Sequence, residues 1–536
     1  MLSLIFHALA FYATTALSAP CNKTDIRPTA TIDCGIAVGT TTSLPSSTVT
    51  INKFLGIPFG TIPVRFGPPE PPLPFESTYD ASEYKPGCIQ KFNYPEYERN
   101  LSIKWYNTPG PPAGESEDCL NLNIFAPAAA PDRPRAVLFW IFGGGFNQGS
   151  GSLDLYDGTS FATNHDVVVV TSNHRLNIFG FPGSPDLPEG ERNLGWLDQR
   201  LALDWVQRNI AAFGGDPGRV TIFGESSGAG SVDALVTAPP RPVPFHAAIM
   251  QSGQATIIAA DNITALSWSL VAKALNCSSQ NELECVRAVP ALELKSLIER
   301  LRLQFGQVRD GGATWADSPR KDRLSSTDEK SRIARVPVFI GSNADEGRNY
   351  AFGYEDAEDY IRQSLQGATE EQIETLLAAY PIGAPGISTE FDRVAKIYTE
   401  VSFQCPAKAV SDDSAAVDIN TWRYFFNASF PNSELFKGSG AHHIAEIRPV
   451  FGTFPTKGST EFQGEVSQVM QEAWARFAKD PNGGPGWEAV PRLAVFGGGA
   501  RAGMSEVGKE ALTIGNASDI DQRCQLYQGL FDDVSN

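Results

Sequence analysis

One short segment carries residues suited to nucleophilic catalysis. Residues 224–230 read GESSGAG, and only Ser226 has glycines two positions away on both sides, Gly224 and Gly228. A serine hydroxyl becomes an effective nucleophile when a base takes its proton and a third group orients that base. In a G-x-S-x-G pattern the serine lies on a sharp turn from a strand into a helix. The pattern therefore predicts acyl-transfer chemistry at Ser226 if the flanking residues form that turn.

The residues around Ser226 predict such a turn. Residues 219–223 (RVTIF) are typical of a short strand, and residues 226–238 (SSGAGSVDALVTA) of a helix of small residues that ends before Pro239. The N–H of Ser227 then lies at a helix N-terminus, where it has no partner within the helix. We therefore expect this N–H to donate to a developing oxyanion.

Further predicted strands alternate with predicted helices. Residues 135–142 (RAVLFWIF), 166–175 (DVVVVTSNHR) and 336–340 (VPVFI) are apolar runs typical of buried strands. Residues 193–215 have the spacing of an amphipathic helix, and residues 355–379 are expected to be helical and charged. This alternation predicts an α/β fold with a large, mostly parallel central sheet flanked by helices.

Chain order limits the candidates for the base and the acid, because on this fold the acid and then the histidine follow the serine. The loop of residues 341–347 (GSNADEG) follows a predicted strand and offers Asp345 and Glu346. The adjacent pair His442 and His443 offers the base, and the local sequence leaves both choices open. The other histidines are excluded by position: His7 lies in a segment expected to be removed, His165 and His174 precede the serine, and His246 follows it too closely.

Gly143, Gly144 and Gly145 follow the strand predicted at residues 135–142. A glycine triplet is often a plain turn, but this position in the chain is where esterases place an oxyanion loop. Glycines leave backbone N–H groups unobstructed, and one lost donor costs about 3 kcal/mol of transition-state stabilisation.

These segments together resemble the type-B carboxylesterases, a family that also contains cholinesterases and several fungal lipases. Residues 213–228 (FGGDPGRVTIFGESSG) are similar to the family's serine signature. Residues 117–127 (EDCLNLNIFAP) are similar to its second signature, although Asn121 stands where an aromatic residue or threonine is usual. The segments GGGF, NADEG and HHIAEI match in order and spacing, so the resemblance covers essentially the whole mature chain.

The resemblance implies a single α/β-hydrolase domain of residues 19–536 and hydrolysis of a small-molecule or lipid ester through an acyl-enzyme. It suggests a secreted fungal member and calls for no metal and no organic cofactor. The implied site has Ser226 as nucleophile, Glu346 as acid and His443 as base, with Gly144, Gly145 and Ser227 as oxyanion donors.

The resemblance also implies structural roles. Arg65 with Glu117, and Arg175 with Asp198, resemble internal ion pairs of the family. His174 replaces the more usual aromatic residue beside Arg175 and is expected to be a packed core histidine. The implied disulfides are Cys88–Cys119, Cys277–Cys285 and Cys405–Cys524, which leaves Cys21–Cys34 as the remaining pair.

The segment between Cys88 and Cys119 is rich in aromatic residues. The family places a mobile flap or an aromatic substrate wall there, whereas packing of these side chains against the body of the protein is an equally good interpretation. The residues concerned are Phe92, Tyr94, Tyr97, Trp105 and Tyr106.

Several features predict export. Residues 2–17 are apolar and lead into the small-x-small pattern Ala16-Leu17-Ser18, which predicts a signal peptide at residues 1–18. The eight cysteines are an even number without C-x-x-C pairs, which favours disulfides. No second apolar run is long enough to span a bilayer. Glycan acceptors of the N-x-S/T type are Asn22, Asn100, Asn262, Asn276, Asn427 and Asn516.

Composition and chemistry leave two rival functions. A net charge of −18 argues against nucleic acid as a partner. An acyltransferase or lactone-opening enzyme of secondary metabolism would use the same triad, so the sequence does not exclude it. A non-catalytic adhesion protein of the same fold typically lacks the serine, whereas this chain keeps every member of the predicted triad.

Overall fold

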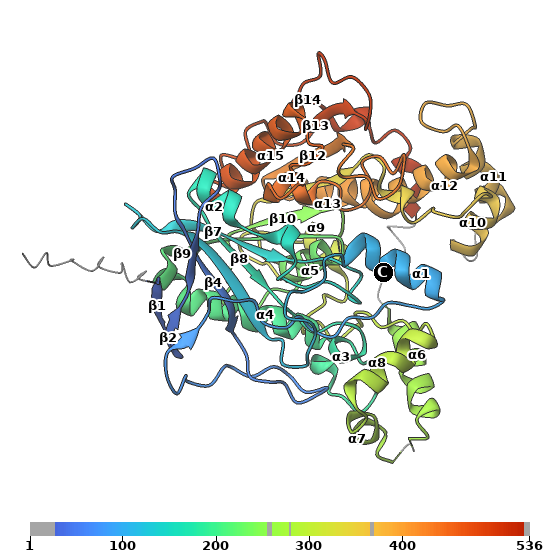
Figure 1. The fold of residues 1–536 in the computed structure, drawn as a ribbon. Coiled ribbons are helices and arrows are strands. Elements are labelled where there is room, and N and C mark those ends of the chain that lie inside the picture. The colour runs from blue at the N-terminus through green and yellow to red at the C-terminus, as the bar shows by residue number, and fades with distance from the viewer. Residues whose placement is uncertain (1–26, 255–259, 278–279, 365–368, 530–536) are drawn as a thin grey trace, which may run out of the picture.

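The computed structural model describes residues 27–254, 260–277, 280–364 and 369–529. The expected signal peptide, Cys21 and Asn22 lie outside the described residues. An eleven-stranded sheet forms the centre of the molecule (Figure 1). In spatial order it contains β14 (Leu512–Asn516), β13 (Arg492–Ala500), β12 (Thr421–Ala428), β11 (Val338–Asn343), β10 (Ala247–Gln251), β9 (Gly215–Glu225), β7 (Arg135–Ile141), β8 (Val168–Ser172), β6 (Asn121–Pro127), β4 (Ile51–Pro58) and β3 (Thr40–Thr42).

The sheet is parallel from β13 to β8 and antiparallel at both margins, where β14 pairs with β13 and β6 with β8. The predicted fold class, an α/β-hydrolase with a mostly parallel central sheet, is confirmed. A second, three-stranded sheet lies near the N-terminus and contains β1 (Thr29–Ile32), β2 (Gly35–Val38) and β5 (Tyr79–Asp80).

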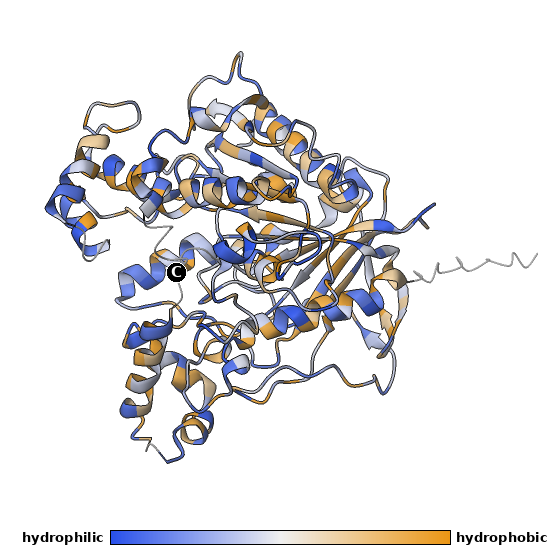
Figure 2. Ribbon diagram, turned by 180° about the vertical axis from the view of Figure 1, so that it is seen from behind, coloured by the Kyte–Doolittle hydropathy of each residue, from blue (hydrophilic) through white to orange (hydrophobic). Residues whose placement is uncertain are grey.

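Helices cover both faces of the sheet because its strands are apolar on both sides. In β7, Leu138 and Trp140 belong to one buried cluster, and Val137, Phe139 and Ile141 belong to the other. Figure 2 shows hydrophobic residues along the central strands and on the helix faces that cover them. The first face packs against α2 (Thr159–His165), α14 (Ile447–Phe451) and α15 (Glu461–Lys479), and the second against α4 (Leu194–Asn209), α5 (Ser227–Thr237) and α13 (Cys405–Ala415).

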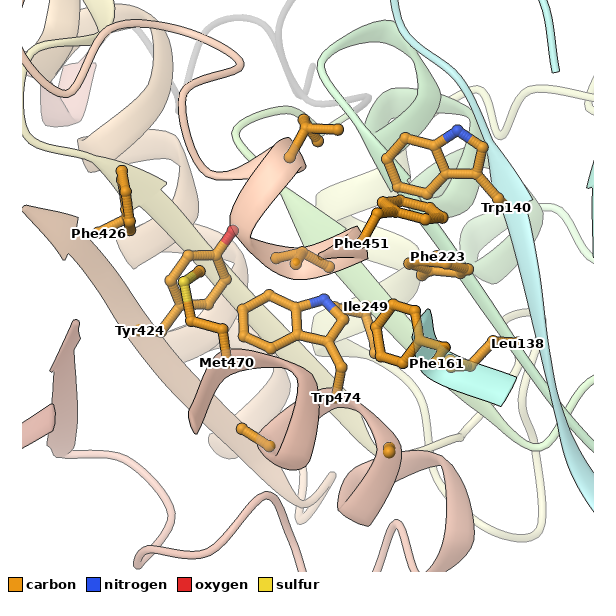
Figure 3. Packing of buried hydrophobic residues seen from close by; sticks show 14 of the residues in the cluster. Leu138, Trp140, Phe161, Phe223, Ile249, Tyr424, Phe426, Phe451, Met470 and Trp474 are labelled. Carbon is orange, nitrogen blue, oxygen red and sulfur yellow. The ribbon is translucent and has the colours of Figure 1, made fainter. Parts of the chain in front are cut away.

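Aromatic packing anchors α14 and α15 on the first face (Figure 3). The ring of Phe451 lies edge-on to Trp140 at 5.0 Å and stacks on Phe223 at 5.7 Å between ring centroids. Trp474 of α15 contacts Tyr424 of β12 at 5.0 Å. Because α14 follows the predicted histidine pair directly, this packing fixes the position of that segment over the carboxyl ends of the strands.

Helices α6 (Asp261–Ala274), α7 (Glu282–Arg287) and α8 (Ala291–Arg300) form one group away from the sheet, and α10 (Ala357–Ser364), α11 (Glu370–Ala379) and α12 (Glu390–Thr399) form another (Figure 1). Two shorter helices are α3 (Asn177–Gly180) and α9 (Pro319–Leu324). The helical region predicted at residues 355–379 thus corresponds to α10 and α11. A π-helical turn, Glu400–Gln404, separates α12 from α13.

The predicted strands differ from the structure in their limits: the strand at residues 166–175 is shorter, Val168–Ser172, and that at residues 135–142 ends at Ile141. The strand predicted at residues 219–223 is the end of the longer β9, because Gly215 already pairs with Arg135 of β7. The strand predicted at residues 336–340 begins at Val338 and extends to Asn343, because its parallel partners β10 and β12 set the register. The shift brings Asn343 into the strand, next to the predicted acid.

Helix α1 (Glu96–Tyr106) lies inside the Cys88–Cys119 segment and was not predicted. It has no buried residue, so its sequence lacks the apolar periodicity that would predict a helix. Glu96 and Glu98 in its first turn interact favourably with the helix dipole. Arg302, just after α8, pairs with Glu98 at 2.9 Å, and Asn349 Nδ2 donates to the hydroxyl of Tyr106 at 2.5 Å. These contacts place α1 between the segment after α8 and the segment after Glu346.

The implied ion pairs and the core histidine are present. Arg65 pairs with Glu117 at 2.5 Å and Arg175 with Asp198 at 2.7 Å. His174 is buried and stacks on a phenylalanine ring, and burial lowers its pKa to about 3, so it is neutral.

The structure contains three of the implied disulfides, Cys88–Cys119, Cys277–Cys285 and Cys405–Cys524. Cys34, the expected partner of Cys21, is buried. Within the described residues, no helix combines the length and apolarity that a membrane crossing requires. Among the glycan acceptors, Asn100, Asn262, Asn276 and Asn516 are exposed, whereas the amide oxygen of Asn427 accepts a hydrogen bond from Arg501 at 2.8 Å.

Candidate active site

Ser226 lies on the turn that the sequence predicts. β9 ends at Glu225 and α5 begins at Ser227, and Ser226 between them has φ 56° and ψ −126°. Its N–H donates to the carbonyl of Gln251 at the end of β10, at 2.9 Å. A Cβ on Gly228 would lie 2.1 Å from the carbonyl oxygen of Ile141, so only glycine fits there. The turn therefore depends on the flanking glycine and presents the serine at the carboxyl end of the sheet.

His443 and Glu346 form a buried hydrogen-bonded pair. Nδ1 of His443 lies 2.7 Å from Oε2 of Glu346, and both side chains are almost fully buried. The second oxygen of Glu346 accepts the N–H of Asn343 at 2.7 Å. Both carboxylate oxygens therefore have donors, which orients the acid toward the imidazole.

The neighbouring candidates, Asp345 and His442, have other partners. Oδ2 of Asp345 accepts the N–H of Ala441 at 2.9 Å. The ring nitrogens of His442 face two carbonyl oxygens, that of His443 at 2.6 Å from Nδ1 and that of Ser433 at 3.1 Å from Nε2. Of the candidates that the local sequence left open, Glu346 and His443 are the two that the structure joins to each other.

The other nitrogen of His443 faces Glu225. Nε2 lies 3.0 Å from Oε1 of Glu225, whose side chain is buried beside the nucleophile. No hydrogen bond joins Ser226 to His443 in the part of the chain that the structure describes. Ser226 is the residue that follows Glu225. To take the proton of Ser226, the imidazole of His443 must turn its Nε2 away from Glu225 and toward the serine hydroxyl.

The glycine loop packs directly against this turn. A Cβ on Gly143 would lie 2.9 Å from Cβ of Ser226. Gly144, with φ 115°, directs its carbonyl toward the loop interior, where it accepts the N–H groups of Asn147 at 3.0 Å and Gln148 at 3.2 Å. Gly144 and Gly145 line the same pocket as Ser226 and His443. The loop is therefore placed where the predicted oxyanion donors are needed.

The pocket that holds these groups has a volume of about 450 Å³. Trp105 and Tyr106 of α1 and Tyr350 line it, and Trp105 also packs against Phe352 at 5.5 Å between ring centroids. Tyr97 is 68% exposed. Both interpretations of the Cys88–Cys119 segment are therefore right in part: two of its aromatic residues form a pocket wall, and Phe92, which is buried, packs inside.

A third buried carboxyl group, Glu446, was not recognised as part of the site. Its oxygens accept Nδ2 of Asn343 at 2.5 Å and Nε2 of Gln251 at 3.2 Å. Burial, together with the charges of Glu225 and Glu346, raises the pKa of Glu446 to about 8. The only sequence signal was its place in HHIAEI, and nothing local marks Asn343 or Gln251.

The carboxylates control the charge of His443. Burial by itself lowers the pKa of His443, but Glu225 and Glu346 outweigh it and raise this pKa well above its usual value. Burial also raises the pKa of Glu225, while His443 opposes that shift. A base with a raised pKa becomes neutral, and thus competent, only at a higher pH.

Glu225→Gln is expected to shift the acidic limb of kcat/KM to lower pH. The amide cannot hold a negative charge beside Nε2, so the pKa of His443 falls and the neutral imidazole persists in more acidic solution. The pH profile on a neutral aryl ester measures this shift. Glu434→Gln, which alters a pocket residue without an ion pair to His443, is the control and should leave the limb in place. An unchanged limb in Glu225→Gln would contradict the assignment.

A serine on a strand-to-helix turn, a histidine–carboxylate pair and a glycine loop at one edge of an α/β sheet characterise the hydrolases of this fold. The profile of the Carboxylesterase family matches residues 26–494, and the chain belongs to that family. It is accordingly a carboxylic ester hydrolase.

Individual relatives agree with this assignment. The chain is 33% identical to acetylcholinesterase of Bungarus fasciatus over 480 residues, which cover 82% of this chain and 76% of the relative. It is 34% identical to carboxylesterase 5A of Mus musculus over 478 residues, covering 82% and 79%. It is 33% identical to the para-nitrobenzyl esterase of Bacillus subtilis (strain 168) over 469 residues, covering 82% and 88%.

Proposed function

We propose that the protein is an exported serine ester hydrolase that works through an acyl-enzyme on Ser226. The observation that carries the proposal is the 2.7 Å bond between His443 and Glu346 in the pocket that also contains the serine. The glycine loop of Gly144 and Gly145 lines the same pocket as Ser226 and His443. Each group has the role that acyl transfer requires.

In the first half of the reaction, His443 takes the proton of Ser226 as Oγ attacks the ester carbonyl. Glu346 holds the imidazole in the tautomer with its proton on Nδ1 and stabilises the imidazolium that forms. The N–H groups of Gly144, Gly145 and Ser227 bind the oxyanion. The imidazolium then returns its proton to the departing alcohol, which leaves an acyl group on Oγ.

In the second half, water enters and His443 takes one of its protons while the oxygen attacks the acyl carbon. Collapse of this second oxyanion releases the carboxylic acid and returns the proton to Ser226. An alcohol in place of water would complete a transfer reaction by the same steps.

Export of the protein is supported by the signal peptide predicted at residues 1–18 and by the three disulfides. Disulfides persist in oxidising compartments and are rare in the cytosol.

The charge of the pocket favours neutral esters over esters with a free carboxylate. The carboxyl groups of Asp154, Glu225 and Glu434 line it, and Arg448, the one guanidinium among the described residues of its wall, pairs with Asp154 at 3.2 Å. Acidic groups thus outnumber the guanidinium, and a negative charge on the acyl chain meets like charge.

4-Nitrophenyl valerate and mono-4-nitrophenyl glutarate test both conclusions, since they differ only in a terminal methyl or carboxylate. We expect valerate to give a burst of one nitrophenol per active site, the sign of an acyl-enzyme. We expect kcat/KM for the glutarate to be about tenfold lower, equivalent to about 1.4 kcal/mol, and the gap to narrow in high salt. The mechanism would be overturned if no burst appeared although deacylation limits the rate. It would also be overturned if the enzyme released no valeric acid from 4-nitrophenyl valerate. Equal kcat/KM values would overturn the substrate preference alone.

A further inference from the structure

A segment of three residues after Cys88 holds the oxyanion loop in place. Oε1 of Gln90 accepts the N–H of Gly149 at 2.7 Å. The N–H of Lys91 donates to the carbonyl of Asn147 at 2.8 Å. The two ends of residues 147–149 are therefore bonded to the segment after Cys88, which the Cys88–Cys119 disulfide links to the start of β6.

Lys91 adds a side-chain contact to this attachment. Its Nζ donates to Oδ1 of Asn147 at 3.3 Å, and Nδ2 of the same amide donates to the carbonyl of Gly145 at 2.7 Å. The N–H of Asn147 donates to the carbonyl of Gly144 at 3.0 Å. Asn147 thus binds the carbonyls of both proposed oxyanion glycines, and Lys91 binds Asn147 through its backbone and its side chain.

Burial of this lysine is unfavourable for the fold. Lys91 is only 3% exposed, and among the described residues no carboxylate lies within 4 Å of its Nζ. Glu299, whose charge acts on Lys91, accepts the N–H of Phe92 at 2.9 Å and pairs with Arg99 at 3.6 Å. Burial lowers the pKa of Lys91 to about 8, and Glu299 opposes the shift. A buried amine without an ion pair lowers the free energy of unfolding of the protein.

We propose that Lys91 is a positioning residue for the oxyanion hole: through Asn147 it holds the Gly144–Gly145 peptide, whose N–H is a proposed oxyanion donor, and the Gly145–Phe146 peptide that follows it. The inference rests on the proposed function of Gly144 and Gly145. It concerns a residue that does not line the pocket and does not touch the substrate.

The peptide geometry explains how such a contact would act. The carbonyl of Gly144 and the N–H of Gly145 belong to one peptide group. The donor on that carbonyl is the backbone N–H of Asn147, which fixes the plane of the group and polarises its N–H, because hydrogen bonds in a chain strengthen one another. The amine of Lys91 holds Asn147 in place for this bond through its side-chain oxygen, while the side-chain Nδ2 of Asn147 holds the next peptide at the carbonyl of Gly145. An oxyanion donor is effective only when it is held in place before the charge develops. Loss of the contact from Lys91 would let the loop relax, and relaxation weakens binding of the transition state more than binding of the ester.

Lys91→Met tests the proposal, because methionine has a similar length and no charge. We expect kcat on 4-nitrophenyl valerate to fall about tenfold, less than the 10²- to 10³-fold loss that follows complete removal of a donor. KM should stay within about twofold, since ground-state binding is unchanged. The midpoint of thermal unfolding at pH 7 should stay equal or rise, because the buried charge is gone.

Lys509→Met is the matched control. The amine of Lys509 holds a glycine loop directly, since it donates to the backbone carbonyls of Gly498 and Gly499 at 3.1 Å, but it lies outside the pocket. This variant should keep kcat and unfold at an equal or lower temperature. Lys91→Met is thus expected to lose activity without losing stability, and Lys509→Met is expected to keep its activity whether or not it loses stability.

A transition-state analogue and a double variant separate positioning from general loosening. A trifluoromethyl ketone forms a hemiketal oxyanion on Ser226, so its inhibition constant should rise in Lys91→Met by the factor that kcat/KM falls. Asn147→Ala should cause a similar loss, and Lys91→Met with Asn147→Ala should lose no more than either alone, since both act through one contact.

Unchanged kcat and unchanged ketone inhibition in Lys91→Met would overturn the proposal, as would fully multiplicative losses in the double variant. A lower unfolding temperature, together with a loss of active-site titre that accounts for the whole fall in activity, would also overturn it. That result would mean that the variant is partly unfolded. Failure of the proposed function is distinguishable, because Ser226→Ala would then retain activity whatever Lys91→Met does.

Discussion

Ser226→Ala is expected to reduce kcat on 4-nitrophenyl valerate by at least about 10⁴-fold, because loss of a serine nucleophile alone removes nearly all the rate that the triad supplies. The glycine loop and the pocket remain, so substrate should still bind. The side chain is small and half-buried, and the N–H of Ser226 keeps its bond to Gln251, so the unfolding temperature should change little. Stopped-flow kinetics with a titrated enzyme measure the loss, and the burst of nitrophenol should vanish.

Ser227→Ala is the matched control, since it makes the same chemical change one residue away. Among the described residues, the hydroxyl of Ser227 accepts one hydrogen bond, from the N–H of Phe146 at 3.3 Å, while its proposed catalytic group is the backbone N–H. We expect less than about a tenfold loss, in keeping with one weak hydrogen bond. If Ser227→Ala were the inactive variant and Ser226→Ala active, or if a phosphonate labelled a different residue in the wild type, the assignment of the nucleophile would be wrong.

The sequence predicted the parts of the site that depend on local pattern. Residues 219–238 form a strand, a turn and a helix because an apolar β-branched run meets glycines and then small helix-forming residues, all within one short segment. The burial of β7 and β8 followed in the same way from continuous apolar runs. Such features need no information about distant segments of the chain.

What the sequence did not predict arises from contacts between distant segments. The bond of Glu446 to Gln251 joins residues 195 positions apart, and Glu225 reaches His443 only because β9 and the loop before α14 meet at one edge of the sheet. Helix α1 lacks a buried face, so its sequence shows no apolar period. Likewise, nothing near Lys91 in the sequence indicates that its amine is buried beside Asn147.

Together these contacts place two carboxyl groups, Glu225 and Glu346, against the imidazole of His443, and a third, Glu446, is bonded to Asn343 and Gln251. Glu346 has two donors, as the proposed orienting acid requires, whereas burial raises the pKa values of Glu225 and Glu446. Mutual repulsion makes it unfavourable for all three to be charged at once. The two carboxyl groups that contact His443 raise its pKa, which favours the imidazolium that the proposed proton transfers require.

Glu346→Gln tests the acid in that arrangement, and we expect it to lower kcat by about 10³- to 10⁴-fold, the scale found when the orienting carboxylate of a triad becomes an amide. The carboxylate accepts two hydrogen bonds, from the N–H of Asn343 and from Nδ1 of His443. Glutamine has one acceptor oxygen and an NH₂ group that only donates. If the oxygen faces Asn343, the NH₂ faces Nδ1, which must then give up its proton, and Nε2 carries the proton instead. An imidazole protonated on Nε2 cannot accept the proton of Ser226.

The control for this variant is Asp345→Asn. Oδ2 of Asp345 accepts the N–H of Ala441 at 2.9 Å, and an asparagine oxygen can do the same. Its longer contact, 3.6 Å to Arg501, is partly exposed and worth at most about 1 kcal/mol. Asp345→Asn should therefore keep kcat within about threefold, on the scale of that weak ion pair. Equal losses in the two variants would indicate that the loop merely tolerates no change, and a larger loss in Asp345→Asn would move the acid to Asp345. A selective loss in Glu346→Gln, with the unfolding temperature little altered, is the result expected if the bond to Nδ1 sets the tautomer of His443.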